Sequence, residues 1–183
     1  MYFSGLAAVC PPMVSPFTFG WSSIAHERVL PSAPASAAFE SDNRTVYVPV
    51  LVPVLSVIRR LWWANGDTVN AANNVDCGVY ASAGYIPGTR LISTGSVAQG
   101  TASQVQFVDV TDTTIPPGLY WIGFGCSTMS ATFFRASASG GNVDQDAAYR
   151  FEESAFPLPA TATPAEATNS PIYLCGFATT ASP

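Results

Sequence analysis

Apolar and polar positions alternate in short runs along the middle of the chain, and each run closes at Asn, Gly, Asp or Pro. Residues 57–64, 75–82 and 119–127 are the clearest runs, and they are rich in β-branched and aromatic residues. A period of two places successive side chains on opposite faces of a strand, and the closing residues favour turns. The same signals predict further strands at 45–53, 90–97, 104–111, 131–136, 149–152 and 171–179.

Strands that follow one another at roughly eight- to twelve-residue spacing, with no convincing helical pattern, indicate an all-β protein. We predict an antiparallel β-sandwich, jelly-roll-like, with an up-and-down barrel as the alternative. The prolines of 45–53 place that strand at an edge or a bulge. Gly95 is expected to break the weaker strand at 90–97.

Alternation also assigns the tryptophans to faces. Trp62 and Trp63 are adjacent in one predicted strand, so we expect one in the core and the other against an adjoining arm, a partner or solvent. Trp121 is expected to point away from the face shared by its neighbours Tyr120, Ile122, Phe124 and Cys126.

The first 43 residues show little periodicity and closely spaced prolines, which prevent a long helix and disfavour a central strand. Aromatic residues, among them Phe17, Phe19 and Trp21, distinguish this segment from a typical disordered tail. We predict an extended N-terminal arm over 1–43, lying along a partner or its own domain, and a β-sandwich domain over 44–183. A disordered tail or an extra edge strand are the alternatives.

Hydrophobic residues make up 48% of the 183 residues and charged residues only 10%, against about 25% in ordinary soluble domains. So few charges indicate that much of the outer surface is covered by neighbouring subunits, as in an obligate homo-oligomer. The net charge of −5 and the lack of any basic patch exclude nucleic-acid binding and polybasic membrane attachment. No apolar run reaches the ~18 residues of a membrane span.

The N-terminus lacks the positive region of a signal peptide. If Met1 is the true start, we expect synthesis in a cytosol, which favours buried thiols over disulfides for Cys10, Cys77, Cys126 and Cys175. A disulfide between Cys77 and Cys126 is the alternative if their strands are adjacent. The single histidine and the scattered cysteines give no zinc-like spacing.

Acidic residues offer two further possibilities. A calcium site could draw on Asp76, Asp109, Asp112, Asp144 and Asp146, but no known loop pattern supports it, and solvated turns and strand ends explain these residues.

Glu152–Glu153 could serve acid/base hydrolysis, but the sequence places no second carboxylate at the required separation. The sole histidine lies in the arm, so a catalytic triad has no evident base. We predict no enzyme, no cofactor and no metal. Arg59 and Arg60 are expected on opposite faces of their strand, one paired with Asp76 or Asp109 and the other exposed or interfacial.

Three tryptophans of the sandwich, Trp62, Trp63 and Trp121, are compatible with a platform for sugar stacking, but core or interface packing is the favoured interpretation. The candidate interface or ligand aromatics are therefore Phe17, Phe19, Trp21, Trp62, Trp63 and Trp121.

Part of the chain resembles a β-sandwich module common in tailed-bacteriophage virion proteins. The resemblance spans residues 57–124 and is carried by Trp62-Trp-Ala-Asn-Gly66, Asn74-Val-Asp-Cys-Gly-Val-Tyr80, the run 91–100 and the run 108–121. In phages such modules resemble parts of tail-associated, appendage or capsid-decorating proteins. The resemblance implies a scaffold and carries over no functional residue.

We therefore expect a non-enzymatic structural component of a bacteriophage virion, made in the host cytoplasm. Its expected partners are other virion proteins and further copies of itself, in a trimer or ring. The alternative is a module that binds host-surface glycan through the loop 140–146 or an exposed tryptophan.

Overall fold

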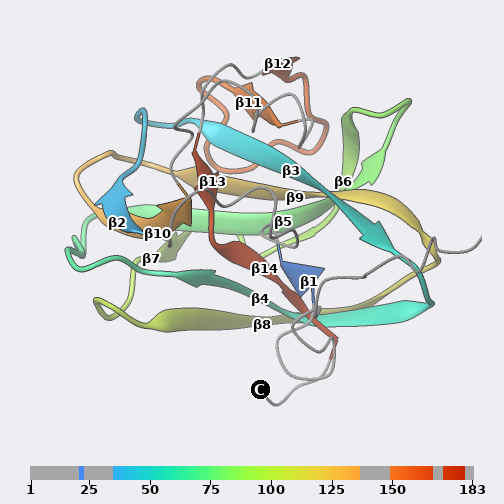
Figure 1. Cartoon of the computed structure of the whole chain (residues 1–183), viewed down its shortest axis with the longest axis horizontal. Helices are drawn as coiled ribbons and strands as arrows, with labels where there is room; N and C mark the ends of the chain where they lie inside the picture. Colours follow the sequence, from blue (N-terminus) through green and yellow to red (C-terminus); the bar gives the residue numbers. More distant parts are fainter. Residues whose placement is uncertain (1–20, 23–34, 137–148, 167–170, 180–183) are drawn as a thin grey trace, which may run out of the picture.

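The computed structural model describes residues 21–22, 35–136, 149–166 and 171–179, which form strands and turns without a helix. Every pairing between these strands is antiparallel (Figure 1). The prediction of an all-β, antiparallel sandwich is confirmed. Within these ranges, no helix is long and apolar enough to cross a membrane.

The strands, in chain order, are β1 Trp21–Ser22, β2 Ala35–Ala38, β3 Thr45–Val52, β4 Ser56–Ala64, β5 Asn74–Ser82, β6 Pro87–Ser93, β7 Val97–Ala98, β8 Val105–Ile115, β9 Gly118–Cys126, β10 Thr132–Ala136, β11 Arg150–Glu152, β12 Ala165–Glu166, β13 Ile172–Tyr173 and β14 Cys175–Ala178. The break predicted at Gly95 separates β6 from β7, and its φ of 67° lies in the left-handed region that favours glycine.

The largest sheet has seven strands, in the order β12-β11-β3-β9-β5-β6, with β7 also pairing with β5. A four-stranded sheet, β1-β14-β4-β8, and a three-stranded sheet, β13-β10-β2, make up the rest. β11 pairs with β3 only over Thr45–Tyr47. Beyond Tyr47, that side of β3 pairs with no described strand, so the edge position predicted from its prolines is confirmed.

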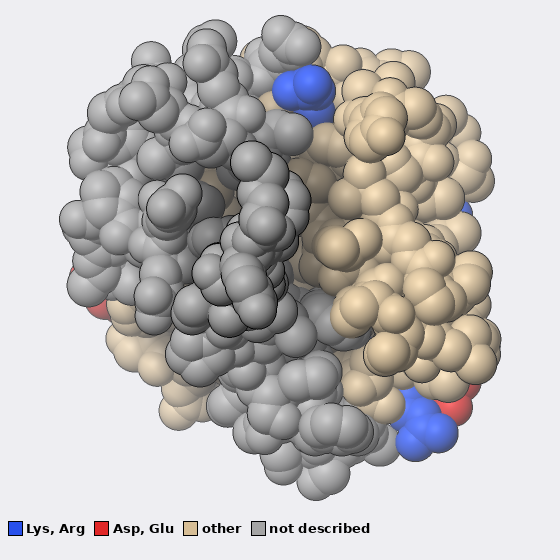
Figure 2. Space-filling model, turned by 45° about the vertical axis from the view of Figure 1, so that its right-hand side comes forward, with Lys and Arg blue, Asp and Glu red and all other residues tan. Residues whose placement is uncertain are grey.

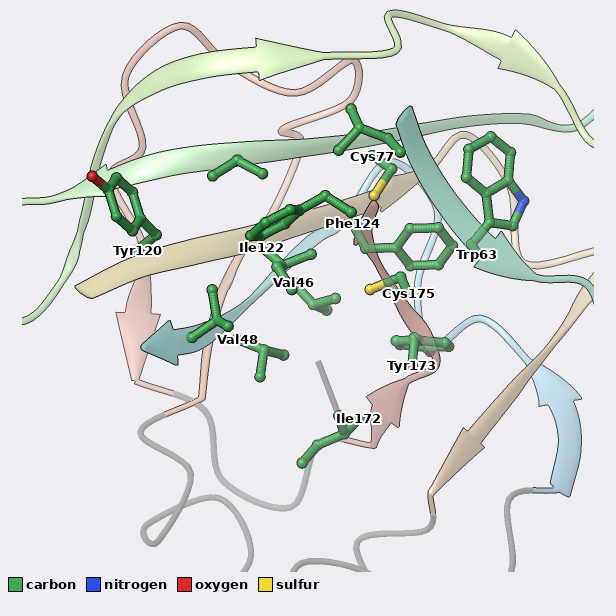
Figure 3. Packing of buried hydrophobic residues seen from close by; sticks show 14 of the residues in the cluster. Val46, Val48, Trp63, Cys77, Tyr120, Ile122, Phe124, Ile172, Tyr173 and Cys175 are labelled. Atoms are coloured by element: carbon green, nitrogen blue, oxygen red, sulfur yellow. The ribbon is translucent and has the colours of Figure 1, made fainter. Parts of the chain in front are cut away.

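The main core lies between the seven-stranded sheet and the other two sheets. Ile122, Phe124 and Cys126 of β9 face into it, as their alternation predicts, and Trp63 of β4 meets them from the opposite side. The rings of Trp63 and Phe124 lie 6.2 Å apart between centroids, and Figure 3 shows the two side chains side by side. Burial of these two apolar faces is what holds the layers together.

A second, smaller cluster covers the outer face of the large sheet and consists of Tyr47, Tyr80, Trp121, Leu158 and Ala162. Trp121 therefore points away from its neighbours, as predicted. The segment 155–162 closes over this face, because the Tyr80 hydroxyl donates to the Pro159 carbonyl at 2.7 Å and the amide of Ala162 donates to the Gly88 carbonyl at 2.9 Å. The segment thereby also covers edge strand β6.

The sandwich includes residues that precede Arg44, where the predicted domain begins. Ala35–Ala38 form β2 and pair with β10. Phe39 is buried in the main core and stacks on Tyr173 with 4.5 Å between ring centroids. The residues of β2 are all small, so the sequence shows no alternation of apolar and polar positions there. Small residues can nevertheless pair with a neighbouring strand. The extra edge strand, one of the alternatives, is what this part of the predicted arm forms.

The predicted closing strand 171–179 is also interrupted. Leu174 lies between β13 and β14, which belong to different sheets. Its amide donates to the Phe134 carbonyl and its carbonyl accepts from the Ala64 amide, both at 2.9 Å. One residue therefore links β10 of the three-stranded sheet to β4 of the four-stranded sheet.

Candidate interaction surface

The three tryptophans of the sandwich are all buried. Trp63 belongs to the main core and its indole N–H donates to Oδ1 of Asn65 at 3.0 Å. Trp121 is buried in the second cluster. Trp62 lies outside both clusters, as expected of its opposite orientation, yet it is only 5% exposed, so the solvent-facing alternative is wrong. A sugar cannot stack on these buried rings, and the platform they were considered for is not formed.

The structure does not describe the side chains of the remaining candidate aromatics, Phe17, Phe19 and Trp21. Phe17 and Phe19 fall outside the described residues, and Trp21 is described only as part of the backbone pairing of β1 with β14.

The acidic residues considered for calcium do not form a cluster where the structure describes them. Asp76 is buried in β5, where its carboxylate accepts from the Leu158 amide and the Thr94 hydroxyl, each at 3.1 Å. Burial raises the pKa of Asp76. Asp144 and Asp146 lie outside the described residues. Among the residues that are described, no group of three or more potential ligands comes together to hold a metal ion.

Asp109 and Asp112 instead pair with arginines of the neighbouring strand β4. Arg60 donates to Asp109 at 2.6 Å, so the predicted pairing with Asp109 is confirmed and the alternative with Asp76 is wrong. Arg59 lies 3.3 Å from Asp112 and is exposed, as expected for the second arginine. Such surface pairs contribute about 0–1 kcal/mol each to the stability of a protein, so they are a minor part of what holds β8 to β4.

The glutamates considered for hydrolysis have structural partners. Glu152 accepts from the Tyr47 hydroxyl at 2.9 Å and from the amide and hydroxyl of Thr163 at 2.9 and 2.8 Å. Burial raises the pKa of Tyr47, which keeps its phenol protonated as the donor. Glu153 pairs with Arg44. These contacts tie β11 and its flanking segment to β3.

The cysteines in the described part of the chain are thiols. Cys77, Cys126 and Cys175 are all buried, and the prediction of buried thiols is confirmed for these three. In the register of β5 and β9, Cys126 lies opposite Val75 and Cys77 lies opposite Phe124, so the Cys77–Cys126 disulfide is not formed. Burial raises the pKa of Cys126 to about 11, which leaves little reactive thiolate at neutral pH. Cys10 lies outside the described residues.

None of the predictions made from the sequence includes the exposed apolar surface at one end of the sandwich. It is formed by the turns that join β3 to β4, β5 to β6 and β8 to β9. We call it the apolar end and define it by its exposed residues, which are Leu51, Pro53, Val54, Leu55, Tyr85, Ile86, Pro116 and Pro117.

Strand register places these turns together. Val52 at the end of β3 pairs with Gly118 at the start of β9, and Ala81 near the end of β5 pairs with Tyr120 two residues further along β9. Figure 1 shows the three turns on the right-hand side of the molecule. Leu51 and Leu55 are each 67% exposed and Tyr85 is 80% exposed, which is high for large apolar side chains.

No residue of the apolar end is charged. Figure 2, which brings this side of the molecule forward, shows a surface of uncharged residues, drawn in tan on the right, with charged groups only near its margins. Large apolar side chains that gather on the surface of a folded domain often mark a site of interaction.

Tyr85 is held outward by a strained turn. The amide of Ala83 donates to the Ile86 carbonyl at 2.8 Å, and Gly84 and Tyr85 between them have φ of 63° and 67°. Two successive left-handed residues are the pattern of a type I′ hairpin, where Asn and Gly are preferred. A tyrosine in this region costs on the order of 1 kcal/mol or more, and such strain is concentrated at functional positions.

A signal for the apolar end was present in the sequence. Residues 46–55 are apolar almost without interruption. A strand with one buried face needs an apolar residue only at every second position, so burial of one face explains only half of this run. The surplus apolar positions extend past the end of β3 into the turn at Val54 and Leu55.

Comparison of the chain with protein-family models finds no match. Comparison with curated proteins finds none either. The apolar end must therefore be interpreted from its own geometry and chemistry.

Proposed function

We propose that this protein is a non-enzymatic structural component of a bacteriophage virion, which assembles with neighbouring subunits through its sandwich surface and its N-terminal segment. The observation that carries the proposal is the apolar end. The resemblance of residues 57–124 to phage virion modules supports the virion as its setting. The carboxylates considered for catalysis or calcium binding support a scaffold as well, because hydrogen bonds and ion pairs within the fold engage Glu152, Glu153 and Asp76.

The size of the apolar end suits an assembly interface. From their exposed fractions, Leu51, Val54, Leu55, Tyr85 and Ile86 together expose on the order of 500 Å². This lies toward the upper limit of the roughly 300–600 Å² found for the largest patch on an ordinary monomer. Covering it on two partners removes on the order of 1,000 Å² from water, which is the lower bound for a specific interface.

The proposal is tested by measuring the mass of the purified protein by light scattering over a wide range of concentration, together with its incorporation into phage particles. We expect an oligomer that the double variant Leu51→Glu, Leu55→Glu disrupts without loss of β-structure. The matched control is Met129→Glu, since Met129 is 50% exposed in the turn after β9, at the opposite end of the sandwich. A wild-type protein that stays monomeric and is absent from purified particles would overturn the proposal.

The N-terminal contribution needs a deletion that spares the core. Removing residues 1–20 leaves β1, β2 and Phe39 in place. We expect this deletion to reduce incorporation into particles while the sandwich stays folded. Incorporation at the wild-type level would remove the N-terminal segment from the proposal.

A further inference from the structure

The apolar end has two parts of different shape. One is the β5–β6 hairpin, whose tip presents Tyr85. The other consists of Leu51 near the end of β3 and of Pro53 and Leu55 in the turn that follows, and we call it the β3–β4 corner. In the sheet order β3-β9-β5-β6 the two parts are separated by the width of β9 and β5. With strands about 4.8 Å apart, this separation is on the order of 10–15 Å.

We infer that Tyr85 of one copy packs on the β3–β4 corner of a second copy of this chain. This inference rests on the proposed function and names the partner of the same surface. Tyr85 is then the anchor residue of a contact between two different parts of the apolar end. Such a contact can form in a closed ring of copies or in a pair in which each copy binds the other in the same way.

The conformation of Tyr85 is the first support. A left-handed residue at a hairpin tip is most easily Asn or Gly, and here it is a large aromatic residue that is 80% exposed. The turn itself gains nothing from the ring, because its closing hydrogen bond joins the backbones of Ala83 and Ile86. Tyrosine is among the residues that most often dominate binding energy at interfaces.

The chemistry of the β3–β4 corner is the second support. Leucine and proline side chains offer an apolar surface against which an aromatic ring packs. The corner carries no charge, and neither do Tyr85 and its neighbours Gly84 and Ile86. Two negatively charged copies can therefore meet at this surface without placing like charges against each other.

Area is the third support for a second copy as the occupant. One apolar end exposes on the order of 500 Å² of large apolar side chains, so a reciprocal pair, in which both parts of both copies are covered, reaches the ~1,000 Å² of a small specific interface. No charged or hydrogen-bonding pattern on the apolar end selects a chemically different partner.

Crosslinking between two variants tests the contact. Tyr85→Cys and Leu55→Cys are made separately in a Cys10→Ser background, and each is oxidised alone and in an equal mixture. We expect the mixture to give a crosslinked dimer far more efficiently than either variant alone. Efficient crosslinking of Tyr85→Cys with itself, at or above the level of the mixture, would overturn the contact.

Sedimentation velocity of Tyr85→Asn separates binding from folding. Asn suits the left-handed turn better than Tyr, so we expect a higher unfolding temperature together with self-association weakened at least tenfold. Tyr85→Phe should associate like the wild type, because it keeps the ring, and Met129→Ala should associate unchanged. Unaltered self-association of Tyr85→Asn would overturn the inference.

The outcomes also separate this inference from the proposed function. If the wild type oligomerises and the Tyr85 variants have no effect, assembly uses another surface and only the inference falls. If the wild type is monomeric but Leu51→Glu, Leu55→Glu prevents incorporation into particles, the apolar end binds a different virion protein and again only the inference falls. A monomer that is absent from particles overturns both.

Discussion

Replacing Phe39 by alanine should destabilise the sandwich by about 3–5 kcal/mol, the range for truncating a fully buried phenylalanine. Phe39 is 1% exposed. Its ring stacks on Tyr173 at 4.5 Å and meets Phe124 and Phe133 edge-on at 5.9 Å each. Truncation therefore removes three ring contacts and leaves a cavity between the sheets. The surrounding side chains are already closely packed and cannot move far enough to fill it.

A loss of this size is a large share of the 5–15 kcal/mol that stabilises a typical domain. Urea unfolding followed by circular dichroism would show it as a lower midpoint with an unchanged slope. Met129→Ala is the control, because Met129 is 50% exposed at the end of the sandwich opposite the apolar end and its truncation should change stability by no more than about 0.5 kcal/mol. If Phe39→Ala costs less than about 1 kcal/mol, Phe39 is not part of the core and the sandwich begins after it.

Three further predictions concern single residues. Gly78→Ala should cost about 1–3 kcal/mol in unfolding experiments, because its Cβ would lie 2.7 Å from a carbonyl of β6, whereas Gly118→Ala, with no contact closer than 3.5 Å, should be nearly neutral. Burial raises the pKa of Asp76, so the wild type should lose stability as the pH rises above about 3.9 and through the folded-state value, and Asp76→Asn should lack this loss. A pH dependence shared by both proteins would contradict this assignment. Cys126 should resist alkylation at neutral pH until the protein unfolds, and rapid labelling of the native protein, located by mass spectrometry, would contradict its burial.

The sequence predicted the strands of the sandwich because their alternation is a local property. The strands β4, β5 and β9 lie within one or two residues of the predicted ranges. The opposite orientations of Trp62 and Trp63 and of Trp121 and its neighbours follow from the same period of two. Where a strand was missed, as at Ala35–Ala38, its residues are small and nearly uniform, so no face could be distinguished.

The interaction surface was harder to predict because it depends on tertiary structure. Leu55 and Tyr85 belong to different turns, and only the pairing of β3 and β5 with opposite sides of β9 brings those turns to one end. The tryptophans attracted attention as large aromatic residues, but exposure decides whether an aromatic residue can bind a partner. Tyr85 is exposed and has a left-handed backbone conformation, and neither property can be inferred from the dipeptide Gly84–Tyr85.

The same long-range pairing has a consequence for the rate of folding. β1 pairs with β14 and β2 pairs with β10, so strands near the two ends of the described chain complete sheets that local hairpins cannot complete. Folding is slow when contacts join residues far apart in sequence, and sandwiches of this kind fold on the order of milliseconds to seconds. Until β14 inserts between β1 and β4, the edge of β4 that it will cover stays available for pairing with other chains. Aggregation during synthesis therefore competes with folding, and faster expression should lower the yield of native protein.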